Sequence, residues 1–218
     1  MEYHIEGNPD YGQLTVSLSP GESFLAEAGS MAYMSEGTKL KSRLVGGFLK
    51  ALIRKVVGGE SLFVGEYSHP EGGAATFSPN RPGTILQRTM TGEPFILTAG
   101  SFMAATDGVT LNTRFGGLKA LFSGEGAFIV EAGGNGELFF NSYGAIIEKE
   151  VDGALVVDTG HVVAWESSLD YNVTSVGGVK STLFSGEGLV LNFSGTGKVY
   201  LQTRTLRGMA RWLTPFSR

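Results

Sequence analysis

The sequence predicts an all-β protein made of three homologous repeats. One observation is that the stretch FGGLKALFSGEG recurs; its copies lie at residues 45–62, 115–126 and 176–188. A second is that the preceding segments align without gaps; they are residues 14–30, 85–101 and 145–161. A third is that glycine supplies 33 of 218 residues. That share is about twice the usual one and is typical of many turns and bulges.

The period indicates how the repeats are arranged. Units of roughly 60 to 70 residues built from short strands cannot bury their faces alone, so they stack or close around a common axis. We therefore expect a single domain of three repeats over residues 1–218. The expected parts are repeat one at 12–82, repeat two at 83–143, repeat three at 144–205 and a basic C-terminal helix at 206–218.

Repeat one is expected to follow a short lead-in strand at residues 3–5. It opens with a strand whose residues Leu14, Val16 and Leu18 share one face, because apolar and polar residues alternate there. Proline and glycine then predict a turn at 19–22. Further strands are expected at 24–28, 31–34 and 61–67, with a turn at 36–37 and a loop at 69–73.

Repeats two and three contain five glycine-rich sites that predict turns. They lie at residues 91–94, 107–108, 133–136, 152–153 and 195–197. Asp152-Gly153 is the strongest of these signals, because Asp-Gly between strand patterns is typical of a tight hairpin. Strands are expected to follow at 138–141 and 199–203.

Two short amphipathic helices interrupt the β pattern. Residues 48–57, FLKALIRKVV, place apolar side chains over about half of a helical wheel, with Lys50 and Arg54 opposite. From Leu206 onward, apolar residues share one helical face and arginines share another, until Pro215 ends the pattern.

The formal net charge of −4 conceals a segregation of charge. Residues 37–59 and 188–218 contain eleven of the 17 basic residues and none of the 21 acidic ones. Such an asymmetry predicts a cationic contact surface on an otherwise acidic body. Because most of the body is acidic and the isoelectric point is about 5.4, we do not expect nucleic-acid binding.

Composition also limits location and chemistry. There is no cysteine, which excludes disulfides and thiolate chemistry and fits a reducing compartment. The N-terminal residues show no pattern of a targeting peptide, and no apolar run approaches the ~18 residues of a membrane span. We expect a cytoplasmic protein, with a peripheral position at the inner face of the membrane.

Three groups of residues were considered for chemistry and assigned structural roles. The SGEG motifs are interpreted as turns, because no Lys-Ser or Lys-Thr follows them and Glu125 and Glu187 would repel phosphate. The three histidines share no ligand spacing. Asp158, Glu166 and Asp170 could pair for acid–base work, but we favour an exposed acidic rim. We predict no catalytic residue, no metal and no cofactor.

The recurring GGLKALFSGEG stretch, the three AGS-like corners and the basic tail after LQTRTL resemble the altered-inheritance-of-mitochondria family, twenty-fourth member. The resemblance covers about residues 3–215. It implies a fold similar to the tryptophan RNA-binding attenuation protein. The three antiparallel repeats would then be units of the β-sandwich or double-stranded β-helix type around a pseudo-threefold axis. It implies no catalytic residues, and its membrane theme comes from fungal members tied to the mitochondrial inner membrane.

These observations lead to two functional hypotheses. The first is a non-enzymatic scaffold or adaptor, a homo-oligomer with a trimer favoured, that meets an anionic membrane surface or a membrane protein through its basic helices. The expected contact residues are Lys50, Arg54, Lys55, Arg207, Arg211 and Trp212. The same helices could instead cap the β core or pack at a subunit interface. The second hypothesis is a small-ligand-binding module with a pocket between repeats or subunits.

Overall fold

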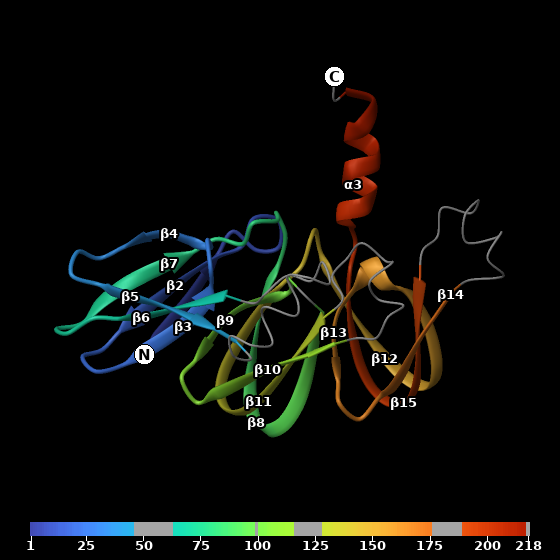
Figure 1. Ribbon diagram of the computed structural model, residues 1–218, viewed down its shortest axis with the longest axis horizontal. Helices are drawn as coiled ribbons and strands as arrows, with labels where there is room; N and C mark the ends of the chain where they lie inside the picture. The colour runs from blue at the N-terminus through green and yellow to red at the C-terminus, as the bar shows by residue number, and fades with distance from the viewer. Residues whose placement is uncertain (46–62, 99, 116–127, 176–188, 217–218) are drawn as a thin grey trace.

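The protein is described by a computed structural model that covers residues 1–45, 63–98, 100–115, 128–175 and 189–216 (Figure 1). Strands dominate these residues, every pairing between named strands is antiparallel, and one short α-helix follows the last strand. The all-β prediction is therefore confirmed. The recurring FGGLKALFSGEG stretch, the helix expected at 48–57 and the residues Lys50, Arg54 and Lys55 lie outside the described residues.

The N-terminal third contains seven short strands. They are β1 (Glu2–Glu6), β2 (Gln13–Leu18), β3 (Ser23–Glu27), β4 (Met31–Met34), β5 (Lys39–Leu44), β6 (Phe63–Ser68) and β7 (Gly73–Phe77). In β2 the side chains of Leu14, Val16 and Leu18 are buried while Ser17 is exposed, so the predicted alternation is confirmed. The turn expected at 19–22 is also confirmed, since the Glu22 amide donates to the Ser19 carbonyl over 3.1 Å.

The rest of the chain contains longer strands. The middle part has β8 (Ile85–Thr98), β9 (Phe102–Thr106), β10 (Val109–Phe115) and β11 (Phe128–Asn141). The last part has β12 (Ile146–Asp158), the 3₁₀ turn η2 (Thr159–His161), β13 (Val162–Glu166), β14 (Asp170–Ser175), β15 (Leu189–Gln202), α3 (Leu206–Leu213) and the 3₁₀ turn η3 (Thr214–Phe216).

The strands form two sheets, and the four-stranded sheet lies against the β3, β5 and β6 end of the larger sheet (Figure 1). The four-stranded sheet has the order β1-β2-β7-β4. The 11-stranded sheet follows the path β12-β15-β13-β8-β11-β9-β3-β6-β5, with β10 added beside β11 and β14 beside β15. Two of the long strands pair with three others each: β11 with β8, β9 and β10, and β15 with β12, β13 and β14.

Four of the predicted turns are wrong. Residues 91–94, 133–136, 152–153 and 195–197 lie inside the single strands β8, β11, β12 and β15. The glycines there face each other across strand pairs, Gly92 opposite Gly134 and Gly153 opposite Gly195, and all four have positive φ. Because both strands bend at the same level, the pair changes direction without reversing. The turn at 107–108 separates β9 from β10 as expected.

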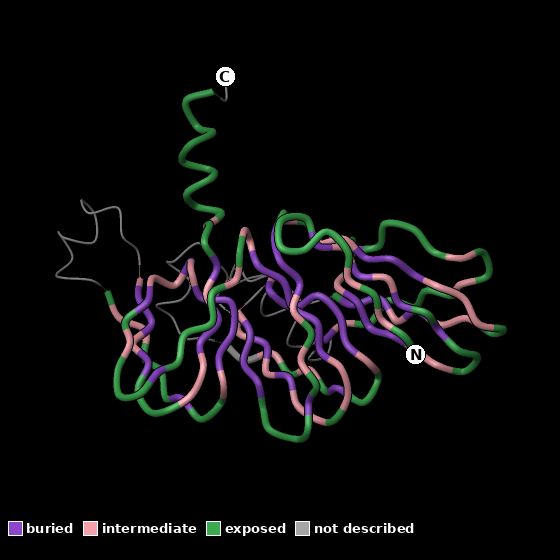
Figure 2. Tube along the Cα trace, turned by 180° about the vertical axis from the view of Figure 1, so that it is seen from behind, coloured by how far each residue is buried: buried purple, intermediate pink, exposed green. Residues whose placement is uncertain are grey.

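The core consists of three clusters of buried apolar side chains. Buried residues occur along the whole length of the molecule (Figure 2). Aromatic rings lie at the centre of each. Phe24 contacts Phe139 with centroids 5.9 Å apart, and Phe95 contacts Tyr200 at 5.5 Å. Trp165 packs edge-on against Phe193 at 5.5 Å. Since these rings come from different parts of the chain, the core joins the N-terminal, middle and C-terminal thirds.

Candidate contact surface on the C-terminal helix

Helix α3 begins where the last strand leaves the sheet. Thr205 is its N-cap, because the Thr205 hydroxyl accepts a hydrogen bond of 3.0 Å from the Gly208 amide. Just before it, the Arg204 amide donates to the Tyr143 carbonyl over 3.2 Å and the Thr203 amide donates to the Ala145 carbonyl over 3.1 Å. The base of the helix is thus attached to the connection between β11 and β12, and the helix projects away from the sheets (Figure 1).

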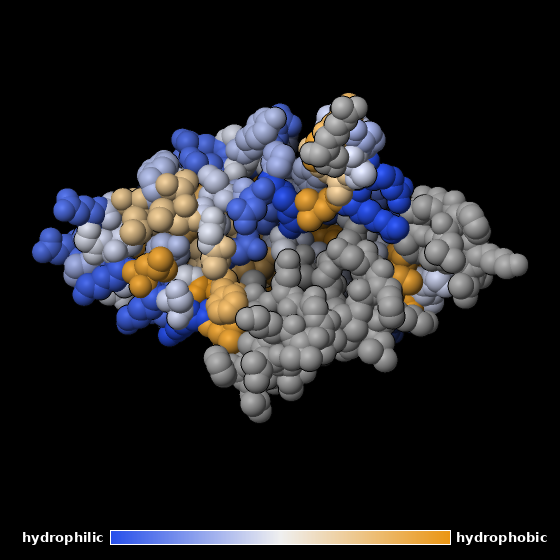
Figure 3. Space-filling model, turned by 45° about the horizontal axis from the view of Figure 1, so that its top comes forward, coloured by the Kyte–Doolittle hydropathy of each residue, from blue (hydrophilic) through white to orange (hydrophobic). Residues whose placement is uncertain are grey.

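No residue of α3 is buried (Figure 2). Its large apolar side chains remain accessible, with Trp212 62% and Phe216 72% exposed, and the two rings contact each other at 5.7 Å. The other exposed apolar side chains are Leu206, Met209 and Leu213. Apolar colour therefore follows the helix that points toward the viewer in Figure 3. A cluster of this kind on a projecting element is typical of a contact surface.

The charges of this helix are all positive. Arg207 and Arg211 lie within α3, Arg204 precedes it, and no acidic residue occurs between residues 188 and 218. A helix with arginines on one side and Trp, Leu and Met on the other has the composition of an interfacial helix. Such an arrangement can bind an anionic surface, but it contains no group able to do acid–base or nucleophilic chemistry.

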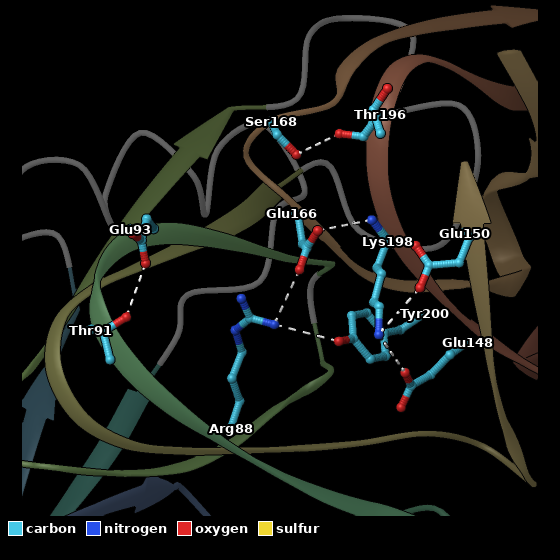
Figure 4. A network of polar contacts seen from close by, with 10 residues as sticks. All are labelled: Arg88, Thr91, Glu93, Glu148, Glu150, Glu166, Ser168, Thr196, Lys198 and Tyr200. Atoms are coloured by element: carbon cyan, nitrogen blue, oxygen red, sulfur yellow. Dashed lines mark hydrogen bonds and ion pairs between the residues drawn. The ribbon is translucent and has the colours of Figure 1, made fainter. Parts of the chain in front are cut away.

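A polar network joins β8, β12, β13 and β15 below the helix (Figure 4). The Arg88 guanidinium lies 3.6 Å from a Glu166 carboxylate oxygen, donates to the Tyr200 hydroxyl over 3.4 Å and stands 4.4 Å from the centroid of Phe95. The other Glu166 oxygen accepts a 3.0 Å hydrogen bond from the Lys198 amide. These contacts tie neighbouring strands together, so we assign the network a structural role.

The outer end of this network is an ion-pair cluster. The Lys198 ammonium lies 3.3 Å from a Glu150 oxygen and 3.6 Å from a Glu148 oxygen. The hydrogen bond and the charge of Glu150, followed by the charge of Glu148, raise the pKa of Lys198 above its ordinary value. Since the cation gains two anionic partners, it is held in its charged form rather than prepared as a base.

Several of the carboxylates and histidines considered from sequence make local contacts, while Asp170 is exposed at the start of β14. Asp158 accepts from the Gly160 amide over 2.9 Å and begins η2. The Nδ1 atom of His161 lies 2.7 Å from the Gln202 carbonyl, and Nε2 of His69 lies 2.8 Å from the Glu36 carbonyl. Within the part of the chain that the structure describes, no three His, Asp or Glu residues are grouped so as to hold a metal.

The structure places the expected contact residues Arg207, Arg211 and Trp212 together on α3. Phe216, which lies in η3 within the predicted helical stretch 206–218, is also accessible, although it was not among the expected contact residues. Its place four residues after Trp212 on a continuing helical path is the signal that could have identified it. Among the described residues, no helix is long and apolar enough to cross a bilayer.

The fold and this surface define a class of protein: an antiparallel all-β body that carries a projecting basic amphipathic helix. The sequence profile of the family described as mitochondrial biogenesis AIM24 matches residues 3–204. The chain therefore belongs to the AIM24 family, as the resemblance predicted.

Two relatives from Streptococcus pyogenes are similar over nearly the whole chain. An uncharacterised protein of serotype M6 is 30% identical over 219 residues, which cover 96% of this chain and 88% of that protein. The crystal structure of the S. pyogenes protein SPYM3_0169 superposes with a TM-score of 0.85 at 29% identity and covers 99% of both chains.

Proposed function

We propose that the protein is a non-enzymatic scaffold or adaptor that binds an anionic membrane surface peripherally through α3. The observation that carries this proposal is that the helix combines exposed Trp212, Leu213 and Met209 with two arginines and buries none of its residues. An amphipathic helix whose apolar face meets no core of its own chain has an apolar face available to another surface.

The expected strength of this contact is modest. Each arginine near an anionic surface contributes on the order of 1 kcal/mol, and the inserted apolar side chains add to that. One helix of eight residues gives a weak and reversible attachment. A scaffold that presents several copies of α3 would bind more firmly.

We also propose that residues 12–82, 83–143 and 144–205 are structural repeats, as in the tryptophan RNA-binding attenuation protein. The pairing pattern supports this. The long pairs β8–β11 and β12–β15 correspond to the split pairs β2–β7 and β3–β6, and the short strands β4, β9 and β13 each add to the second member. The pseudo-threefold axis and the trimer remain predictions.

Vesicle flotation tests the membrane contact. We expect the wild-type protein to float with anionic vesicles at low salt, to float less at high salt, and not to float with neutral vesicles. Arg207→Glu should weaken binding at least about tenfold, since it replaces one attraction of about 1 kcal/mol by a repulsion. Trp212→Ala should weaken binding at both salt concentrations, because its contribution is apolar.

Lys149→Glu is the matched control, since it makes the same change in charge at an exposed position of β12. It should bind vesicles as the wild type does. If the wild-type protein floats under none of these conditions, the membrane proposal is wrong. The helix surface would then be assigned to a protein partner.

A further inference from the structure

The body is held together by two strand junctions that have the same register. In the first, β9 adds to β3, with Ala104, Ala105 and Thr106 opposite Ala26, Leu25 and Phe24. In the second, β13 adds to β8, with Ala164, Trp165 and Glu166 opposite Leu97, Ile96 and Phe95. Residues 24–26 and 95–97 occupy the same place in the ungapped alignment of the repeats. Residues 104–106 and 164–166 also correspond when that alignment is continued with the same offset, as the register shifts beside them support.

Both junctions bury their apolar side chains. Phe24 and Phe95 are fully buried, and so are Ala104 and Ala164. The strand that makes each junction carries the same irregularity on its other edge. The register shifts between Phe139 and Phe140 beside β9, and between Val162 and Ala164 in β13. The junction is thus a recurring unit of this fold rather than an accident of one strand pair.

A third set of junction strands exists, but its two halves do not meet in the chain. The alignment assigns 33–35 in and after β4 to one half, and 155–157 in β12 to the other. Strand β4 pairs with β7 alone, with the same register shift between Met31 and Tyr33, and β12 pairs with β15 alone among the described strands. The two strands lie at opposite ends of the molecule (Figure 1).

The side chains at these two edges are apolar and accessible. Tyr33 is 59% exposed, Met34 38% and Val156 61%. The equivalent residues at the two closed junctions are buried, for example Ala105 and Trp165 for Met34. An accessible apolar edge strand is a template for pairing with another chain.

We propose that β4 of one copy pairs antiparallel with β12 of a second copy, in the register of the two internal junctions. Met34 then lies opposite Val156 of the second copy, and Tyr33 lies opposite Val157. The strands β14-β15-β12 of one copy and β4-β7-β2-β1 of the next become one continuous sheet. This inference rests on the repeat relation proposed above and is independent of the membrane contact.

The contact joins two different edges, so the association is head to tail. A head-to-tail contact closes into a ring when the rotation between copies allows it and otherwise continues as a filament. The chain already forms this junction twice between its own repeats. A third junction of the same geometry therefore needs no rearrangement of β4 or β12. Backbone hydrogen bonds and the burial of Met34 and Val156 supply the stabilisation.

Association in solution is the first test. The mass of the wild-type particle in sedimentation velocity should rise above one 23.1 kDa chain with increasing concentration. Met34→Lys and Val156→Lys should each weaken association at least about tenfold, because each buries an unpaired charge at one edge. Ile147→Lys is the matched control, since Ile147 is 46% exposed on β12 but lies outside the proposed register.

Mixing the two blocked variants makes the test specific to a head-to-tail contact. The Met34→Lys chain keeps an intact β12 and the Val156→Lys chain keeps an intact β4, so the mixture should form a particle of two chains that grows no further. Recovery of a dimer in the mixture also shows that both variants are folded.

Disulfide trapping tests the register, and the natural chain has no cysteine to interfere. Met34→Cys mixed with Val156→Cys should give a cross-linked dimer on oxidation, because opposed strand residues lie within disulfide reach. Met34→Cys mixed with Ile147→Cys should give none. A wild-type protein that stays monomeric at all concentrations, variants no weaker than Ile147→Lys, or equal cross-linking at 147 would each overturn the proposal.

Discussion

Tyr200 is the residue at which the middle and last thirds of the chain meet. Its ring contacts Phe95 and Phe140, each with centroids 5.5 Å apart, and its hydroxyl accepts a hydrogen bond from Arg88. Burial raises the pKa of this hydroxyl above its ordinary value; Arg88 opposes the rise, and Glu148 adds to it. Tyr67 has its pKa raised by burial as well. Because these phenols resist ionisation in the folded protein, the free energy of unfolding depends on pH in the alkaline range.

We predict that stability falls above pH ~10, where an unfolded tyrosine loses its proton. The sign follows from the raised pKa, because between pH ~10 and the folded pKa the unfolded chain binds fewer protons than the folded one. Tyr200→Phe should reduce this fall by at most ~1.4 kcal/mol for each pH unit. Urea unfolding at pH 8 and pH 11 measures it. An equal loss of stability in the wild type and in Tyr200→Phe would contradict the prediction.

At the scale of elements, the paired glycines decide the shape of the long strands. Gly92 and Gly134 lie opposite each other with φ of 109° and 78°. A Cβ atom at Gly92 would meet nothing within 4 Å, whereas one at Gly134 would lie 2.4 Å from the Gly108 carbonyl oxygen. Both glycines therefore have a positive φ that is unfavourable for other residues, but only Gly134 is closely packed against another part of the backbone.

This difference predicts unequal costs for the same substitution. Gly92→Ala should lower the free energy of unfolding by about 1–2 kcal/mol, the cost of positive φ alone. Gly134→Ala should cost at least about 3 kcal/mol, because the turn at 107–108 must also move. Chemical denaturation of both variants measures the pair, and equal costs would show that the close approach at Gly134 is relieved without strain.

The same glycines show how far sequence can predict this fold. In the N-terminal third, β2 was predicted because Leu14, Val16 and Leu18 alternate with polar residues, whereas β5 and β7 were not predicted. Asp152-Gly153 was misread as a hairpin because the signal reports only that the backbone can adopt positive φ. Whether the chain reverses or only bends at Gly153 depends on Gly195, which lies opposite Gly153 on strand β15. The residues next to Gly153 in the sequence do not show that Gly195 will pair with it.

For the candidate site, too, the sequence predicted the local structure but not its surroundings. The spacing of Leu206, Met209 and Leu213 predicted the helix, since period alone determines it. Its accessibility could not be predicted, because most amphipathic helices bury their apolar face in their own chain. Likewise, Met34 has the apolar character of its buried counterpart Ala105, and only the open edge of β4 distinguishes the two.

At the scale of the whole molecule, the edge strands β4 and β12 lie toward opposite ends, and one helix projects from the body (Figure 1). Head-to-tail association would repeat α3 at regular intervals without changing any residue of the helix. Copies on one particle act together on a surface, because after the first contact the others bind at high effective concentration. The weak attachment expected of one short helix would thus become firm only in the assembled state.

This coupling predicts that a change at the strand edge alters membrane binding. Val156→Lys leaves α3 unchanged and adds a positive charge, so any loss of binding to anionic vesicles cannot come from repulsion. We expect its apparent affinity to fall at least about tenfold below that of Ile147→Lys, which adds the same charge to β12 outside the proposed contact. Flotation at several protein concentrations measures both. Equal affinities would mean that each α3 acts alone, even if the head-to-tail contact forms.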